Sequence, residues 1–259
     1  MRLPIYQVDA FTDRLFAGNP AAICPLETWL PDATLQSIAL ENNLAETAFF
    51  VKAGDAYELR WFTPAVEVDL CGHATLASAF ILWRKLGCTN GRIDFDTRSG
   101  RLSVFREDEW MELDFPSRPP QVCEVHAGLA DALGGTPRQI LAARDYLVVY
   151  GSEEEVRALK PDMGALMDID RFAVIVTAPG TGCDFVSRFF APAQGVPEDP
   201  VTGSAHCTLT PYWSKRLGKT RMHAKQVSPR GGDLRVEDRG DRVAIAGQAV
   251  LYLEGAIEV

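Results

Sequence analysis

The 259-residue sequence predicts an α+β fold of two pseudo-symmetric domains, each a curved, barrel-like mixed β-sheet around one central buried helix. Three observations predict this fold: an internal repeat, a largely apolar helix in each copy, and short strand-like runs on both sides of that helix. Since 47% of the residues are hydrophobic, the chain can bury a sizeable core without disulfides or metals.

The repeat is visible in two motifs and in the spacing that follows them. The motifs are LRWFTP at residues 59–64 and SRFFAP at residues 187–192. After acidic residues, each leads to a glycine and a run of small residues, Gly72 in the first copy and Gly203 in the second. The interval from Gly72 to Gly87, which ends the stretch RKLG, equals that from Gly203 to Gly218, which ends KRLG. Equal spacing without a gap indicates two homologous halves.

Each interval predicts a helix that begins at its first glycine and ends at a C-cap glycine after cationic residues. The first of these helices has almost no polar stripe, which is typical of a helix buried at the centre of a domain. A further helix is predicted at 31–43. Strands are predicted at 5–10, 47–52, 57–62, 93–96 and 102–105, and at 146–150, 172–177, 185–190, 234–237 and 243–246.

The boundary between the halves is expected at the proline-rich segment 116–120, which neither a helix nor a central strand can cross. We therefore expect an N-terminal domain over 1–117 and a C-terminal domain over 118–259, with the option that the last strand returns to the first domain.

Composition and missing motifs exclude several function classes. The net charge of −9 disfavours a nucleic-acid partner. No segment has the apolar length of a membrane helix or signal peptide, so we expect a cytoplasmic protein without a membrane partner. The six cysteines form no C-x₂₋₄-C pair and are expected to be reduced thiols. Neither a Rossmann turn, a complete P-loop, an HExxH helix nor a GxSxG elbow is present.

The two helix starts are candidate binding sites for an anionic small molecule. Helix N-termini carry free backbone N–H groups and partial positive charge, and Gly72 and Gly203 let a ligand approach the backbone. The alternative is that both glycines form only tight turns. Close by, His73, Asp199 and Ser204 are candidates for proton transfer or binding, although Ser204 as an N-cap and Asp199 as a turn former remain open.

Glu46 is the most telling carboxylate, because it lies where a helical segment gives way to an apolar strand. Burial beside Leu44 and Phe49 is an environment that prepares a carboxylate for general acid–base work. Its counterpart in the second half falls near Arg171–Phe172 and is not a glutamate. This loss of symmetry suggests function, with a surface glutamate at a strand start as the alternative. The histidines at 126, 206 and 223 have no comparable context and are expected to be structural or exposed.

Taken together, the motifs resemble the PhzF-like phenazine-biosynthesis isomerase family, which is related in fold to diaminopimelate epimerase and proline racemase. The resemblance covers essentially the whole chain. It is carried by DAFT at 9–12, FAGNP at 16–20, NLAET at 43–47, FTP at 62–64, Glu67, LCGHAT at 70–75 and DPVTGS at 199–204.

The resemblance implies a homodimer that uses no metal and no organic cofactor. It implies that Glu46 is the general acid/base and that His73 and Asp199 place or relay protons. The residues implied to bind the substrate are Asn19, Gly72, Gly203 and Ser204.

Diaminopimelate epimerases carry a cysteine before the glycine in both halves, whereas this sequence has Cys71 and Thr202. Threonine is too weak an acid or base for that role, so a two-thiol epimerase is disfavoured. The sequence therefore predicts a cofactor-independent isomerase that moves a proton on a small carboxylate-bearing substrate in the cleft between the halves. An epimerase, racemase or dehydratase of the same fold and a non-catalytic binding protein are the alternatives.

Overall fold

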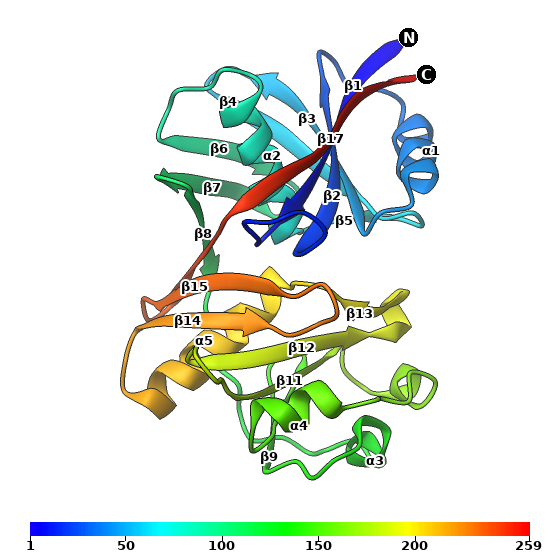
Figure 1. The fold of residues 1–259 in the computed structure, drawn as a ribbon. Coiled ribbons are helices and arrows are strands. Elements are labelled where there is room, and N and C mark those ends of the chain that lie inside the picture. Colours follow the sequence, from blue (N-terminus) through cyan, green and yellow to red (C-terminus); the bar gives the residue numbers. More distant parts are fainter. The chain divides into compact units, whose positions relative to one another are not determined.

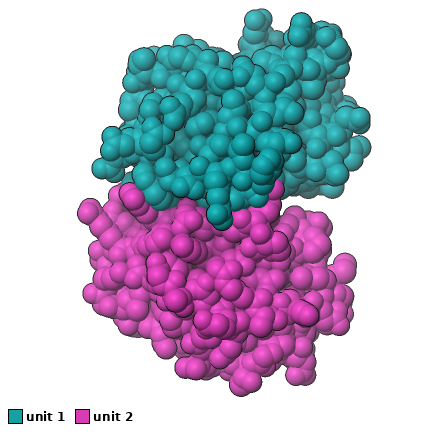
Figure 2. Space-filling model, in the orientation of Figure 1, with its two compact units in different colours: residues 1–114, 246–259 teal, residues 115–245 magenta.

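The structure, a computed structural model, describes residues 1–259, which form two compact units (Figure 2). Residues 1–114 and 246–259 make up unit 1, and residues 115–245 make up unit 2. No helix is long and apolar enough to cross a membrane.

Unit 1 consists of antiparallel and parallel strands around a buried helix (Figure 1). Its helices are α1 (Asp32–Asn42) and α2 (Gly72–Arg84). Its strands are β1 (Arg2–Ala10), β2 (Asn19–Leu26), β3 (Glu46–Ala53), β4 (Ala56–Phe62), β5 (Glu67–Val68), β6 (Arg92–Thr97), β7 (Gly100–Glu107), β8 (Trp110–Pro116, which runs across the unit boundary) and β17 (Ala249–Glu258).

The helix α2 is the centre of unit 1, as its apolar sequence predicts. It packs against β1, β2, β3, β7 and β17, and its side chains from His73 to Ala79 are all buried. The C-terminal strand β17 pairs with β1 along its length, so the end of the chain belongs to unit 1. Because strands lie around α2 on several sides, its two ends are the parts of the helix that remain for contact with a ligand.

Unit 2 repeats this plan with additional short helices. Its helical segments are α3 (Leu129–Leu133), α4 (Glu153–Ala158), α5 (Gly203–Leu217) and the 3₁₀ turns η1 (Ala165–Asp168) and η2 (Pro192–Gln194). Its strands are β9 (Gln139–Ala142), β10 (Tyr146–Val149), β11 (Val174–Pro179), β12 (Phe185–Ala191), β13 (Val196–Asp199), β14 (Arg221–Gln226), β15 (Gly232–Asp238) and β16 (Arg242–Gly247, whose last residues lie in unit 1).

Three central strand pairings of the two units match. The antiparallel pair β3–β4 corresponds to β11–β12, and the parallel pair β4–β6 corresponds to β12–β14. The parallel pair β2–β3 likewise corresponds to β10–β11. The pseudo-symmetry predicted from equal spacing is therefore present in the topology.

One side-chain contact is repeated as well. Arg60 on β4 donates from Nε and Nη2 to the Glu67 carboxylate on β5, at 2.7 and 2.8 Å. Arg188 on β12 makes the same fork with Glu198 on β13, at 2.8 and 3.0 Å. Each guanidinium also lies over the phenylalanine two residues further along its strand, at 5.1 and 4.9 Å from the ring centroid. Paired donors and acceptors of this kind fix the hairpin that leads to each central helix.

The central helix of unit 2 contains Pro211, which has no N–H to donate to the carbonyl of Cys207. The carbonyl is satisfied from outside the helix, because the backbone N–H of Arg118 donates to it at 2.9 Å. Arg118 belongs to the proline-rich segment between the halves. This hydrogen bond connects the proline-rich segment to α5. The carbonyl of Cys207 is available as the acceptor because Pro211 has no N–H to bond it.

The loop between β1 and β2 depends on Gly18, which stands at φ +67°. A Cβ at this position would lie 2.2 Å from the carbonyl oxygen of Ala10 and 2.7 Å from Cγ2 of Thr12. Since Asn19 follows directly, this close approach of the backbone sets where the Asn19 side chain enters the core.

We predict that Gly18→Ala destabilises the protein much more than Gly54→Ala. Gly54 has a similar φ of +63°, but nothing lies within 4 Å of the place that a methyl group would take, so its substitution adds only the left-handed backbone strain of about 1–2 kcal/mol. Gly18→Ala adds a backbone clash to the same strain. Urea unfolding of both variants measures the difference. Equal losses of unfolding free energy would show that the close approach at Gly18 is not required.

Candidate active site

Glu46 is positioned by the end of a helix and the start of a strand. Asn43 adopts the left-handed conformation at φ 48° and ends α1 through its N–H bond to the carbonyl of Ala39. The chain then enters β3 at Glu46, and Asn42 Nδ2 donates to Thr47 Oγ1 at 3.1 Å. The Glu46 side chain is 18% exposed, so it is partly buried and still reaches solvent.

Glu46 faces His73 in the first turn of α2. Glu46 Oε2 lies 3.1 Å from His73 Nε2, and the His73 side chain is only 6% exposed. The other ring nitrogen, Nδ1, lies 3.3 Å from Nδ2 of Asn19 and 3.5 Å from Sγ of Cys71. The structure thus brings together three predicted site residues, Glu46, His73 and Asn19, and adds Cys71 to them.

The electrostatics of this cluster favour an ion pair. Burial opposes the charged form of the imidazole, but the Cys71 sulfur and the Glu46 carboxylate beside the ring more than compensate, so the pKa of His73 lies well above its ordinary value. Burial raises the pKa of the Cys71 thiol to about 11, and the Glu46 charge acts in the same direction. The Glu46 carboxylate beside the ring therefore raises the pKa of His73, whereas burial raises the pKa of the Cys71 thiol.

The start of α2 offers backbone donors next to this pair. Cys71 is the N-cap residue, and the helix begins at Gly72. Thr75 is the first residue whose N–H bonds back within the helix, to the carbonyl of Cys71 at 3.2 Å. The N–H groups of Gly72 and His73 precede it and have no carbonyl partner in the helix. This arrangement is suited to an anion.

In unit 2 the corresponding helix start is held by different groups. Thr202 is the N-cap of α5, its N–H donates to Gln226 Oε1 at 2.8 Å, and its hydroxyl donates to Asp199 Oδ2 at 2.5 Å. Gln226 Nε2 also donates to the carbonyl of Asp199 at 2.7 Å. Asp199, Gly203 and Ser204 therefore lie at one helix start, as predicted. Ser204 is not the N-cap, because it lies one residue inside the helix.

Sequence reasoning missed Arg144, whose Nη2 donates to Ser204 Oγ at 3.3 Å. Its guanidinium also bonds the Asp145 carboxylate and stacks on the ring of Phe172, 4.3 Å from the centroid. The pairing of β10 with β11 corresponds to that of β2 with β3. When the two pairings are aligned, Arg144 lies within one residue of the position equivalent to Asn19. Extending the repeat to β10 would have revealed it. A polar side chain from this position touches the first helical turn in both units.

The strand registers also define the counterpart of Glu46. Phe62 pairs with Thr47 in unit 1, and Phe190 pairs with Val174 in unit 2. Ala173 therefore takes the place of Glu46, close to the predicted Arg171–Phe172. The carboxylate is present in only one copy of the repeat.

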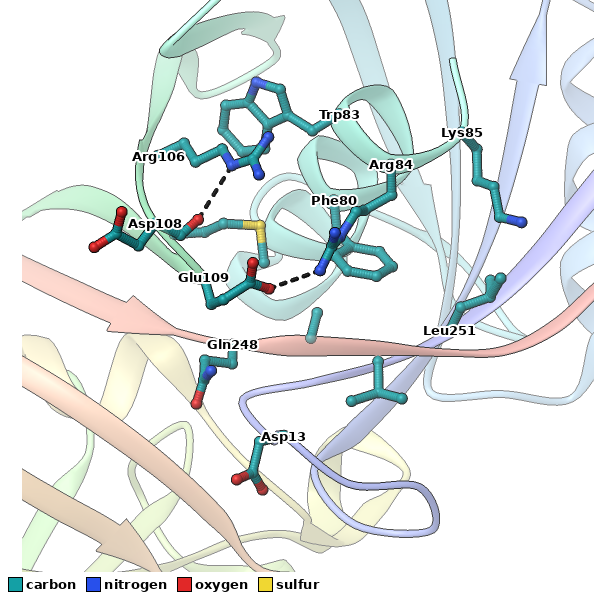
Figure 3. Close-up of a pocket in the computed structure, with 13 residues that line it drawn as sticks. Asp13, Phe80, Trp83, Arg84, Lys85, Arg106, Asp108, Glu109, Gln248 and Leu251 are labelled. Carbon is teal, nitrogen blue, oxygen red and sulfur yellow. Dashed lines mark hydrogen bonds and ion pairs between the residues drawn. The ribbon is translucent and has the colours of Figure 1, made fainter. Parts of the chain in front are cut away.

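A surface pocket of about 510 Å³ lies at the opposite, C-terminal end of α2 and contains none of the predicted site residues (Figure 3). Its cations are already engaged: Arg84 bonds Glu109 at 2.7 Å, and Arg106 donates to the carbonyl of Asp108 at 3.2 Å. These contacts leave the N-terminal end of α2 as the stronger candidate for chemistry in unit 1.

Comparison with known proteins agrees with these features. A family model described as "Phenazine biosynthesis-like protein" matches residues 8–255. An uncharacterized isomerase of Pseudomonas aeruginosa is 52% identical, with the match covering 100% of both chains. The human phenazine biosynthesis-like domain-containing protein is 43% identical over 99% of both chains.

Solved structures give the same result for the fold. A PhzF-family phenazine biosynthesis protein from Enterococcus faecalis matches with a TM-score of 0.98 and 48% identity over 100% of both chains. A hydroxyproline epimerase from Agrobacterium vitis matches with a TM-score of 0.65 and 9% identity, over 99% of this chain and 91% of the epimerase. This second match concerns the fold alone. The predicted epimerase-like α+β fold is confirmed.

His206 lies in the first turn of α5 and is fully buried in unit 2. Its Nδ1 donates to the carbonyl of Thr202 at 2.8 Å, and its ring lies 6.0 Å from that of Phe185. Burial lowers the pKa of His206 from 6.5 to about 4, although the hydrogen bond to Thr202 opposes the shift. The residue is structural, as the sequence indicated.

We predict that His206→Asn weakens the acid sensitivity of folding. Because the folded state disfavours the protonated ring, stability is fully present above the unfolded pKa of 6.5 and is lost as the pH falls towards about 4. At 1.36 kcal/mol per unit, the loss attributable to His206 is about 3 kcal/mol of unfolding free energy. Urea unfolding between pH 7 and pH 4 measures it, with His223→Asn as the exposed-histidine control. An unchanged slope in the His206 variant would contradict the assignment.

Proposed function

The chain belongs to the PhzF family of phenazine biosynthesis-like isomerases, and from that premise we propose that it moves a proton between carbons of a small carboxylate-bearing substrate without a cofactor. Glu46 takes the proton from a carbon next to an electron-withdrawing group and returns it to another position. The substrate is cyclic or resembles an amino acid. The reaction is an isomerisation, so atoms and electrons balance within the substrate.

The observation that carries this proposal is the pair formed by Glu46 and His73, 3.1 Å apart at the start of α2. An ionised carboxylate that still reaches solvent can act as a base. The Nε2–H group of His73 beside it can stabilise the negative charge that develops as the proton moves between the substrate and Glu46. Asn19, at 3.3 Å from the other ring nitrogen, orients the imidazole.

The chemistry of the helix starts supports a carboxylate on the substrate. Both helices begin at a glycine whose N–H has no partner within the helix, and Arg144 adds a permanent cation beside Ser204 in unit 2. The proposal gives Asp199 and Ser204, at the start of α5, roles in substrate binding and proton relay. Because the net charge is −9, attraction of an anion has to come from such local donors.

The two-thiol epimerase remains the weaker alternative. The Thr202 hydroxyl is already donated to Asp199 at 2.5 Å, and burial raises the pKa of Cys71 to about 11, which disfavours a thiolate base. A single carboxylate base is a better match to these groups than a pair of thiols acting on opposite faces.

We predict that Glu46→Gln abolishes proton exchange while leaving the fold intact. The amide keeps the shape of the side chain but cannot accept the substrate proton, so turnover should fall about 10²-fold or more. Cyclic and aromatic amino acids and related carboxylates are incubated with the enzyme in D₂O, and deuterium incorporation is followed by NMR or mass spectrometry.

Glu41→Gln, an exposed glutamate near the end of α1, is the matched control and should exchange like the unmodified protein. If a substrate is found and Glu46→Gln exchanges it at the same rate, Glu46 is not the base. If substrates bind but none exchanges with any variant, the protein is a binder and the proposal fails.

We predict that Arg144→Gln raises the KM for the substrate about 10-fold or more and lowers kcat by a smaller factor. The substitution removes a cation expected to pair with the substrate carboxylate, and such charge-assisted bonds contribute about 1.5–3 kcal/mol. Steady-state kinetics on a substrate from the exchange screen measure both constants. Arg157→Gln, which alters an exposed arginine paired with Glu153, is the control. An unchanged KM would show that Arg144 does not bind the substrate carboxylate.

A further inference from the structure

A pocket of about 520 Å³ lies in unit 2, between the C-terminal half of α5, the strand β9 and the segment 119–122. Cavities of this size bind small organic molecules in many proteins. None of the predicted site residues lines the pocket, so the proposed reaction does not account for it.

Hydrogen bonds fix two walls of this pocket. Pro211 lies inside α5, and the Cys207 carbonyl that its missing N–H leaves open accepts from the N–H of Arg118 at 2.9 Å. Three residues further on, Gln121 exchanges two backbone hydrogen bonds with Ala142 of β9, at 2.8 and 2.9 Å. The segment between these two attachments is held to the helix at one end and to the sheet at the other. The pocket is therefore preformed, which lowers the entropic cost of binding a ligand.

Tyr212 connects the other two walls. Its hydroxyl donates to Oε1 of Gln139, at 3.2 Å, which links α5 to β9. Because Oε1 is the acceptor in this bond, the Nε2 group of Gln139 remains as a donor for a ligand. Burial raises the pKa of Tyr212, and the Arg216 guanidinium beside the hydroxyl opposes this shift. A cation and an amide thus lie next to one aromatic ring.

Most of the lining is apolar and suits a flat ring. Three prolines, Leu141 and the ring of Tyr212 face the pocket, and Val122 beside them is 88% exposed. Single exposed apolar residues are common, but here apolar side chains from a helix, a strand and a connecting segment line the same hollow. Proline and tyrosine rings pack well against aromatic rings. The lining therefore favours a ligand with an aromatic body.

The charged groups of the pocket are all positive. Lys215 and Arg216 line it, and no lining residue is Asp or Glu. Neither cation forms an ion pair with a carboxylate of the chain. Cations in the last turn of a helix also interact favourably with the helix dipole, but this does not account for the apolar hollow beside them. In a protein of net charge −9, the pocket is a local positive region that attracts an anion.

The pocket at the C-terminal end of α2 provides an internal comparison. It also has two cations at the end of a central helix, Arg84 and Lys85. There, however, Arg84 is paired with Glu109 and Lys85 with Glu254. The cations of unit 1 are neutralised by their partners, whereas those of the unit 2 pocket are available to a ligand.

We propose that the unit 2 pocket binds a small aromatic carboxylate, with the ring against Pro211 and Tyr212 and the carboxylate on Lys215 and Arg216. The site is distinct from both helix starts, so it goes beyond the proposed function. Binding is non-covalent and reversible.

The test titrates the purified full-length protein with naphthoate, an aromatic carboxylate, in a calorimeter. The double variant Lys215→Gln/Arg216→Gln should raise the Kd about 10-fold or more, because it removes the charge-assisted bonds to the carboxylate. Naphthylmethanol keeps the ring but has no charge, and it should bind the unmodified protein more weakly than naphthoate by a similar factor. Acetate, which has the charge but no ring, should bind more weakly still.

Arg157→Gln/Lys160→Gln is the matched control, because it removes the same charge from exposed residues of unit 2 outside the pocket. It should bind naphthoate like the unmodified protein. Arg144→Gln should also leave this binding unchanged, since Arg144 contacts the first turn of α5 and the pocket lies at the other end. Urea unfolding establishes that each variant is folded.

The proposal is wrong if folded, unmodified protein does not bind naphthoate, or if Lys215→Gln/Arg216→Gln binds it equally well. Binding that is lost in Arg144→Gln instead would assign naphthoate to the candidate active site. An aspartate-rich peptide that binds the pocket more tightly than naphthoate would indicate a polypeptide partner, and would also overturn the proposal. None of these measurements uses turnover, so failure here is distinguishable from failure of the proposed reaction.

Discussion

A helix enclosed by its own strands can offer chemistry only at its ends. In unit 1 the side chains of α2 are buried from His73 to Ala79, and strands from several parts of the chain pack around them. The N-terminal turn keeps free N–H groups and partial positive charge because no further turn precedes it. Glu46 and Asn19 reach this turn from β3 and β2, the strands that enclose the helix. The enclosure thus determines both the place of the candidate site and the elements that supply it.

Comparing the two copies of the repeat distinguishes the contacts that both units share from the side chains that differ between them. The Arg60–Glu67 and Arg188–Glu198 forks are the same contact in both units, and each fixes a hairpin that leads into a central helix. At the helix starts the matching side chains differ: Glu46, Cys71 and His73 in unit 1 correspond to Ala173, Thr202 and Ser204 in unit 2.

Much of the fold was predictable because repetition and periodicity are local properties of the sequence. The intervals after Gly72 and Gly203 located both central helices, and their apolar composition indicated burial. The predicted C-cap is confirmed at Gly218 and wrong at Gly87, because α2 ends at Arg84 with Lys85 as its C-cap. The contact between Glu46 and His73 was not predictable, because it depends on how β3 packs against α2, which brings residues distant in sequence together. Arg144 was missed for a related reason: the segment before the short strand β10 lacks the Gly-Asn-Pro signal that marks Asn19. Propensity describes segments, whereas a site consists of contacts between them.

The buried pair of Glu46 and His73 is informative because removing its polar groups from water is unfavourable for folding. Removing an imidazole and a carboxylate from water is unfavourable, and apolar residues of similar size would serve stability equally well or better. His73 nevertheless faces Glu46, and the Asn19 amide in the tight loop after Gly18 touches its other nitrogen. Three separate segments of the chain therefore determine the position of the His73 imidazole. The proposed reaction gives this arrangement a role, because a base that alternates its proton needs a neighbour held in a fixed position.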